Sequence, residues 1–180
     1  MGKYSRRSKG KEIKPTFFVF CEGESEEAYI SFLKSRYHVP IQIKYKVARN
    51  KINQKYVKRI LGPIPKHEKD KYFLLYDLDI PEVVERLNAI KGTILLVSNP
   101  CIELWYILHT CNHNAETTSQ QCLAQLERIY HDYRKGSICD RLRLRLTTGE
   151  EKAITRAKLL PQYRNPSTSI FLFIEELKNI

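Results

Sequence analysis

Four acidic positions have the residue types and the spacing for metal-assisted chemistry: Glu22, Asp77, Asp79 and Glu103. Each one lies at or just past the end of a short apolar run rich in Val, Ile, Phe and Tyr. Runs of this kind are typical of buried strands. If the strands are parallel neighbours, their carboxyl ends lie along one edge of the sheet, where open α/β sheets place their ligand sites.

Carboxylates gathered at that edge repel one another, and a divalent cation removes the repulsion. Oxygen ligands suit magnesium or manganese. Strand alternation turns Asp77 and Asp79 to one side and Leu78 to the other. We therefore expect Glu22, Asp77 and Asp79 to bind Mg²⁺ or Mn²⁺. In a basic chain this arrangement suggests phosphodiester chemistry, for which these three residues and Glu103 are the catalytic candidates.

The same acids also have structural explanations. Asp79 can cap the helix expected after Pro81, and Glu103 can act as a capping acid one turn into its own helix. Three further acids are expected in the first turn of a helix, where they favour the helix dipole. The sequence leaves open whether they join the metal site: Glu24, Glu26 and Glu27.

Positive charge dominates the composition, with 31 Lys and Arg against 20 Asp and Glu, a formal net charge of +11. The basic residues cluster in 1–15, 44–71 and 134–145. Such clusters neutralise phosphates and release counterions, although solvated surface charge needs no partner. We expect a nucleic-acid interface formed by Arg49, Lys51, Lys55, Arg141, Arg143 and Arg145.

The elements that must position these residues can be read from hydrophobic periodicity. Strands are expected at 16–21, 41–47, 72–76 and 93–97. Helices are expected at 25–37, 52–61, 81–90, 100–109, 119–133, 150–160 and 168–178. This order favours one α/β domain with a mostly parallel sheet over 16–180, preceded by a basic, flexible segment at 1–15.

Three local details complete the expected organisation. Ser25 is a plausible N-cap for the first helix, and Asn165-Pro166-Ser167-Thr168 most simply caps the last one. Residues 141–146 alternate Leu with Arg, which predicts a short edge strand or an extended loop.

Several protein classes are disfavoured by what the sequence lacks. No apolar run approaches the ~20 residues of a membrane helix, and no signal peptide is recognisable, so we expect a cytoplasmic protein. The five cysteines include no CxxC pair, and they are expected to be reduced. The His109-x-Cys111-x-His113 pattern matches none of the usual zinc templates. No GxxxxGK[ST] loop occurs, so any use of ATP would belong to a partner.

Taken together, these motifs resemble the RloB-like proteins, a family associated with phage-defence loci and related to TOPRIM-type nuclease and topoisomerase domains. The matching segments are Cys21-Glu22-Gly23-Glu24 with Glu27, Asp77-Leu78-Asp79, Ser98-Asn99-Pro100-Cys101-Ile102-Glu103-Leu104-Trp105 and Asn165-Pro166-Ser167-Thr168.

The resemblance implies a TOPRIM-like three-layer α/β/α domain with about four strands and extra C-terminal helices. It also implies roles for the acids. Glu22 would be general base or metal ligand, Asp77 and Asp79 would hold the metal, and Glu103 would be a further ligand or a supporting group. A nearby gene for an AAA- or ABC-type ATPase partner, and a role in abortive infection, are implied as well.

The first hypothesis is therefore a Mg²⁺- or Mn²⁺-dependent nuclease acting on DNA or RNA. One alternative is a non-catalytic module that binds nucleic acid or a partner complex. Another is a metal-dependent nucleotide hydrolase. Metal-dependent turnover separates an enzyme from a binding module, and the length of the substrate separates a nuclease from a nucleotide hydrolase.

Overall fold

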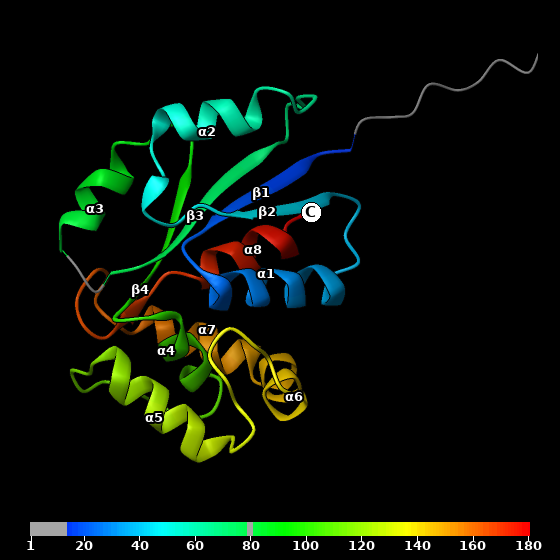
Figure 1. The fold of residues 1–180 in the computed structure, drawn as a ribbon. Helices are drawn as coiled ribbons and strands as arrows, with labels where there is room; N and C mark the ends of the chain where they lie inside the picture. Colours follow the sequence, from blue (N-terminus) through cyan, green and yellow to red (C-terminus); the bar gives the residue numbers. More distant parts are fainter. Residues whose placement is uncertain (1–13, 79–80) are drawn as a thin grey trace, which may run out of the picture.

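The computed structural model describes residues 14–78 and 81–180, and within them it places five strands in one sheet (Figure 1). The strands are β1 (Thr16–Cys21), β2 (Gln42–Val47), β3 (Lys71–Asp77), β4 (Ile94–Asn99) and β5 (Ser167–Thr168). Their order is β2-β1-β3-β4-β5, with the first four parallel and β5 antiparallel to β4. The predicted mostly parallel sheet is confirmed, with one short strand added.

The interior strand β1, which lies between β2 and β3, explains why helices cover both faces of the sheet. All six of its residues are buried, and alternate side chains point to opposite faces. Phe17, Val19 and Cys21 belong to one apolar cluster, whereas Phe18 and Phe20 belong to a second cluster. Each face must therefore be covered by helices that bring apolar residues of their own.

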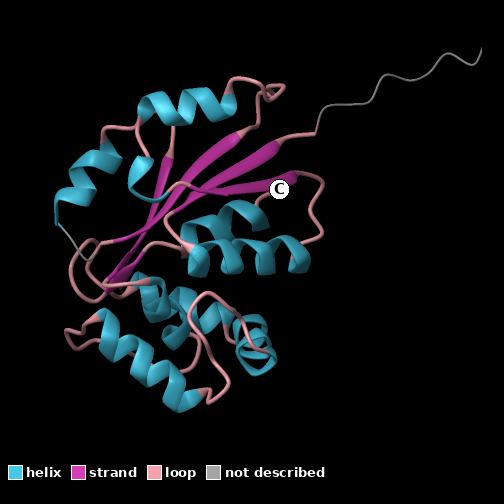
Figure 2. Cartoon of the chain, in the orientation of Figure 1, coloured by secondary structure: helices cyan, strands magenta, loops and turns pink. Residues whose placement is uncertain are grey.

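The helices form the outer layers of the fold (Figure 2). α1 (Glu24–Arg36) and α8 (Phe171–Lys178) cover one face, and α2 (Gln54–Leu61) and α3 (Pro81–Asn88) cover the other. The remaining helices gather in a group below the sheet in this view. They are α4 (Ile102–Leu108), α5 (Ser119–Ile129), α6 (Asp140–Thr148) and α7 (Glu150–Lys158). The three-layer α/β/α arrangement is thus confirmed.

The prediction of an edge strand or extended loop at 141–146 is wrong, because these residues lie in α6. Leu142 and Leu146 are buried at the four-residue spacing of a helix, whereas Leu144 between them is 66% exposed. Arg and Leu also rank among the better helix formers. The alternation in the sequence therefore does not correspond to two faces of a strand.

The predicted cap at Asn165–Thr168 is wrong as well. Ser167 and Thr168 form β5, and the last helix begins at Phe171 rather than at residue 168. The N-cap position of that helix is Ile170, whose side chain makes no capping hydrogen bond.

The N-cap predicted at Ser25 is wrong too. Gly23 is the N-cap of α1, and Ser25 lies buried in the first turn. Two other predictions fall outside the described residues: Asp79, and almost all of the flexible segment at 1–15.

The described cysteines are all free thiols, and Cys21, Cys101 and Cys122 are buried. Within residues 14–78 and 81–180, no helix is long and apolar enough to cross a membrane.

Candidate functional site

Glu22 and Asp77 meet at the carboxyl edge of the sheet. β1 and β3 are parallel neighbours, and the Glu22 N–H donates to the carbonyl of Leu75 at 3.0 Å. The Asp77 N–H donates in turn to Glu22 Oε2 at 2.8 Å. The structure therefore brings together two of the predicted site residues, which are far apart in the sequence, because their strands end side by side.

Glu103 reaches the same region from the first turn of α4. This carboxylate is only 2% exposed. Its Oε1 accepts a hydrogen bond from the Tyr133 hydroxyl at 3.0 Å and a longer one from Ser25 Oγ at 3.4 Å. Two hydroxyl groups from distant segments thus fix the orientation of a carboxylate that is buried away from water.

Glu26 is the fourth acid of the group. Its Oε2 accepts a hydrogen bond from the N–H of Gly23 at 2.8 Å, which ties the side chain to the start of α1. Burial, followed by the charges of Glu22 and Glu103, raises the pKa of Glu26 from 4.5 to about 7, although the backbone hydrogen bonds oppose the rise. We call Glu22, Glu26, Asp77 and Glu103 the acid cluster.

Asp77 is the least satisfied member of the acid cluster. Its Oδ1 is buried and has no hydrogen-bond partner in the part of the chain that the structure describes. Burial, together with the charges of Glu26, Glu103 and Glu22, raises the pKa of Asp77 well above its usual range. A buried carboxylate oxygen without a partner is unfavourable. Binding of a proton or a cation to Asp77 would remove this cost.

The connection between α5 and α6 lies against the acid cluster. Tyr133 is buried there beside Glu103, and the Gly136 N–H donates to Ser25 Oγ at 3.2 Å. Gly136 has a φ of +80°, and a Cβ atom there would lie 3.3 Å from Glu24 Cβ. The positive charge of Lys135 opposes the rise in the pKa of Asp77. We call residues 133–136 the covering loop.

Sequence reasoning missed Ser25, Tyr133 and Lys135 as parts of the site and left Glu26 open. An acid in the first turn of a helix also favours the helix dipole, so the sequence alone does not separate a structural role of Glu26 from a place in the site. The helix predicted at 119–133 includes Tyr133, but α5 ends at Ile129. No local pattern in the sequence places the covering loop beside Glu103.

A divalent cation fits part of this donor set. Among the described residues, no three His, Cys, Asp or Glu side chains are arranged to hold one ion together. Magnesium sites, however, often use only one or two protein carboxylates, with water and substrate phosphates completing the shell. The unpartnered Oδ1 of Asp77 beside Glu22 suits such a site. Asp79, the third predicted ligand, lies outside the described residues.

Arg49 and Lys51 of the predicted nucleic-acid interface lie at the same edge as the acids. They belong to a short 3-10 helix, η1 (Arg49–Lys51), which follows β2. The Tyr76 hydroxyl donates to the Arg49 carbonyl at 3.1 Å, which fixes η1 close to the end of β3. Lys55 is exposed on α2, farther along the same chain segment.

The other three predicted residues lie elsewhere, because α6 packs into the cluster on the opposite face of the sheet from α2 (Figure 1). Helical geometry puts Arg141 and Arg145 on one side of α6 and Arg143 on the other. Arg141 pairs with Asp132 at 3.5 Å, and Arg143 lies over the ring of Phe32. The six basic residues therefore do not form one continuous surface.

Comparison with known proteins identifies the family of this chain. No curated protein and no solved structure matches the chain. The family model described as RloB-like protein matches residues 17–177, a range that runs from the second residue of β1 to the penultimate residue of α8. The chain therefore belongs to the family of RloB-like proteins.

Proposed function

We propose that this protein is a Mg²⁺- or Mn²⁺-dependent nuclease that hydrolyses phosphodiester bonds at the acid cluster. One observation carries the proposal: the buried Oδ1 of Asp77 has no partner among the described residues, although the charges of three further carboxylates, Glu22, Glu26 and Glu103, act on this group. A bound cation offsets such a concentration of negative charge, and it inverts the local pKa shifts. The resemblance to TOPRIM-type domains supports the same chemistry.

The roles of the residues follow from their positions. Asp77 and Glu22 are the proposed ligands, because the Asp77 N–H donates to the Glu22 carboxylate, and Asp79 is the third. A bound Mg²⁺ or Mn²⁺ supplies Lewis acidity toward a phosphate oxygen and lowers the pKa of a bound water. Tyr133 orients Glu103. Lys135 brings a positive charge to the acids, where it can balance a phosphate.

The setting of the reaction is also part of the proposal. Arg49 and Lys51 lie at the acid edge and would contact the nucleic-acid backbone there. Membership of the RloB-like family supports a cytoplasmic role in phage defence by abortive infection, with a separately encoded ATPase as partner. The chain itself contains no GxxxxGK[ST] phosphate loop.

A cleavage assay tests this function. The purified protein is incubated with plasmid DNA, single-stranded DNA or RNA in Mn²⁺, Mg²⁺ or EDTA. Asp77→Asn keeps the shape of the side chain and removes its charge, and Asp140→Asn makes the same change at an exposed position on α6. We expect metal-dependent cleavage that is lost in Asp77→Asn and retained in Asp140→Asn.

Two other outcomes contradict the proposal. Metal-dependent hydrolysis of mononucleotides without cleavage of polymers would identify a nucleotide hydrolase. Binding of nucleic acid without turnover, both alone and with the neighbouring ATPase, would identify a non-catalytic module.

A further inference from the structure

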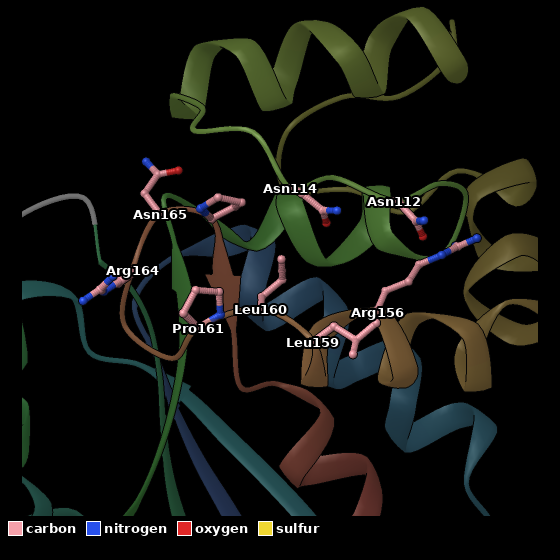
Figure 3. A pocket seen from close by; sticks show the side chains of 9 residues that line it. Asn112, Asn114, Arg156, Leu159, Leu160, Pro161, Arg164 and Asn165 are labelled. Atoms are coloured by element: carbon pink, nitrogen blue, oxygen red, sulfur yellow. The ribbon is translucent and has the colours of Figure 1, made fainter.

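A groove of about 490 Å³ lies between the connection that follows α4 and the loop that joins α7 to β5. Asn112 and Asn114 form one wall, and Leu159 and Pro161 belong to the other (Figure 3). Leu159 is 79% exposed, which is unusual for a large apolar side chain. The volume lies within the range of ligand-binding pockets.

The charge of this groove is entirely positive. Its lining includes Arg156 and Arg164 and no acidic residue, and Figure 3 shows the two arginines at opposite ends. Arg156 donates to the Leu108 carbonyl at 2.5 Å. In the described part of the chain, neither guanidinium pairs with a carboxylate. The groove is therefore complementary to an anion with charges at both ends.

Asn165 holds the two walls together. Its Oδ1 accepts a hydrogen bond from the Thr117 N–H at 3.0 Å, and its Nδ2 donates to the Thr117 carbonyl at 2.6 Å. This pair of hydrogen bonds fixes the loop after α7 against the segment before α5. The Asn165-Pro166 step thus builds the groove instead of capping a helix.

The Arg164 end of the groove is attached to the acid-bearing edge of the sheet. Asn99, the last residue of β4, donates from Nδ2 to the Tyr163 carbonyl at 3.2 Å. The preceding residue, Ser98, is the register partner of Asp77. Tyr163 is 48% exposed and has a φ of +64°, which is uncommon for a bulky residue. The hydrogen bond from Asn99 helps to hold the loop in this conformation.

We infer that this groove holds one unpaired strand of nucleic acid that continues from the acid cluster, so that the substrate is single-stranded. The inference rests on the proposed nuclease function. Arginines at the two ends suit successive phosphates. The amides of Asn112 and Asn114 can bond base edges, and the apolar wall with the exposed Leu159 offers a surface for bases. Paired and stacked bases cannot reach these groups.

Binding measured in EDTA tests the inference without any cleavage. Fluorescence anisotropy compares a labelled single-stranded oligonucleotide, its duplex and a mononucleotide on the full chain. Arg164→Ala removes an exposed guanidinium from the groove, and Arg128→Ala removes an exposed one from α5 as a matched control. Circular dichroism confirms that both variants keep the fold.

We expect the single strand to bind more tightly than the duplex or the mononucleotide. Arg164→Ala should weaken this binding about tenfold, as expected for a lost charge-assisted contact, and reduce the salt slope by about 0.7 for one phosphate. Arg128→Ala should leave the affinity unchanged. Equal binding of duplex or mononucleotide, or an Arg164→Ala affinity equal to that of the control, would overturn the inference.

The two proposals fail separately. If the strand binds as expected and no metal supports cleavage, the nuclease function is wrong and the groove assignment stands. If duplex DNA is cleaved and Arg164→Ala binds and cleaves normally, the nuclease function stands and the groove assignment is wrong.

Discussion

Replacing Glu26 by Gln should stabilise the protein above neutral pH. Glu26 is 4% exposed, and its carboxylate lies among Glu22, Asp77 and Glu103. Gln has nearly the same shape, and its amide oxygen can still accept the hydrogen bond that Gly23 donates at 2.8 Å. The substitution therefore removes the charge while it keeps the local packing.

The magnitude follows from the pKa of the group. A rise from 4.5 to about 7 corresponds to about 3 kcal/mol, since each pH unit is worth about 1.4 kcal/mol. The folded protein retains a proton that the unfolded chain has released. The free energy of unfolding therefore falls as the pH rises from about 4.5 to about 7 and stays low above that pH. The free energy of unfolding of Glu26→Gln does not undergo this decrease, because Gln carries no titratable proton.

Urea denaturation in EDTA, followed by circular dichroism between about pH 4 and pH 8, measures the difference. At the alkaline end, Glu26→Gln should exceed the wild type by up to about 3 kcal/mol, and at the acid end the two should agree. Glu24→Gln is the control. It lies in the same helical turn but is exposed, so it should lose at most about 1 kcal/mol of helix-dipole stabilisation. A Glu26→Gln variant that is less stable at pH 8, or whose advantage does not depend on pH, would refute the reasoning.

Two further substitutions test the packing around the site. Tyr133→Phe removes the hydroxyl that donates to Glu103 at 3.0 Å. The free energy of unfolding should therefore fall by about 1 to 3 kcal/mol in a urea titration. An unchanged value would show that this contact contributes nothing to stability. Gly149→Ala places a Cβ atom 2.5 Å from the His109 carbonyl oxygen, so overpacking by about 1 to 3 kcal/mol should lower Tm by several degrees. A calorimetric Tm equal to that of the wild type would contradict the close approach of Gly149, between α6 and α7, to the His109 carbonyl oxygen.

Of the four long strands, β1, β3 and β4 were predictable because they are continuous apolar runs. β2 was predictable because its apolar residues alternate with polar ones, as in a half-buried strand. β5 was not, because two residues carry no periodicity and their strand exists only through pairing with β4. The Leu and Arg alternation in α6 misled for a related reason. The neighbouring helices decide which leucines of α6 face the core. Leu142 and Leu146 are buried against them, and Leu144 is left exposed.

The candidate site divides in the same way. Glu22 and Asp77 could be brought together from the sequence, because parallel strands end at one edge. Glu26 looked like an ordinary first-turn acid, and only the folded chain shows that it is buried beside Glu103. Tyr133 contacts Glu103 across a connection whose path no local pattern encodes.

A Mn²⁺ titration of the wild type and of Asp77→Asn, by isothermal calorimetry, tests the central claim most directly. If the acid cluster is a cation site, the wild type binds the ion and the variant binds it at least about tenfold more weakly, because the charged oxygen that lacks a partner is gone. Absence of binding to the wild type, or equal binding to both proteins, would contradict the account.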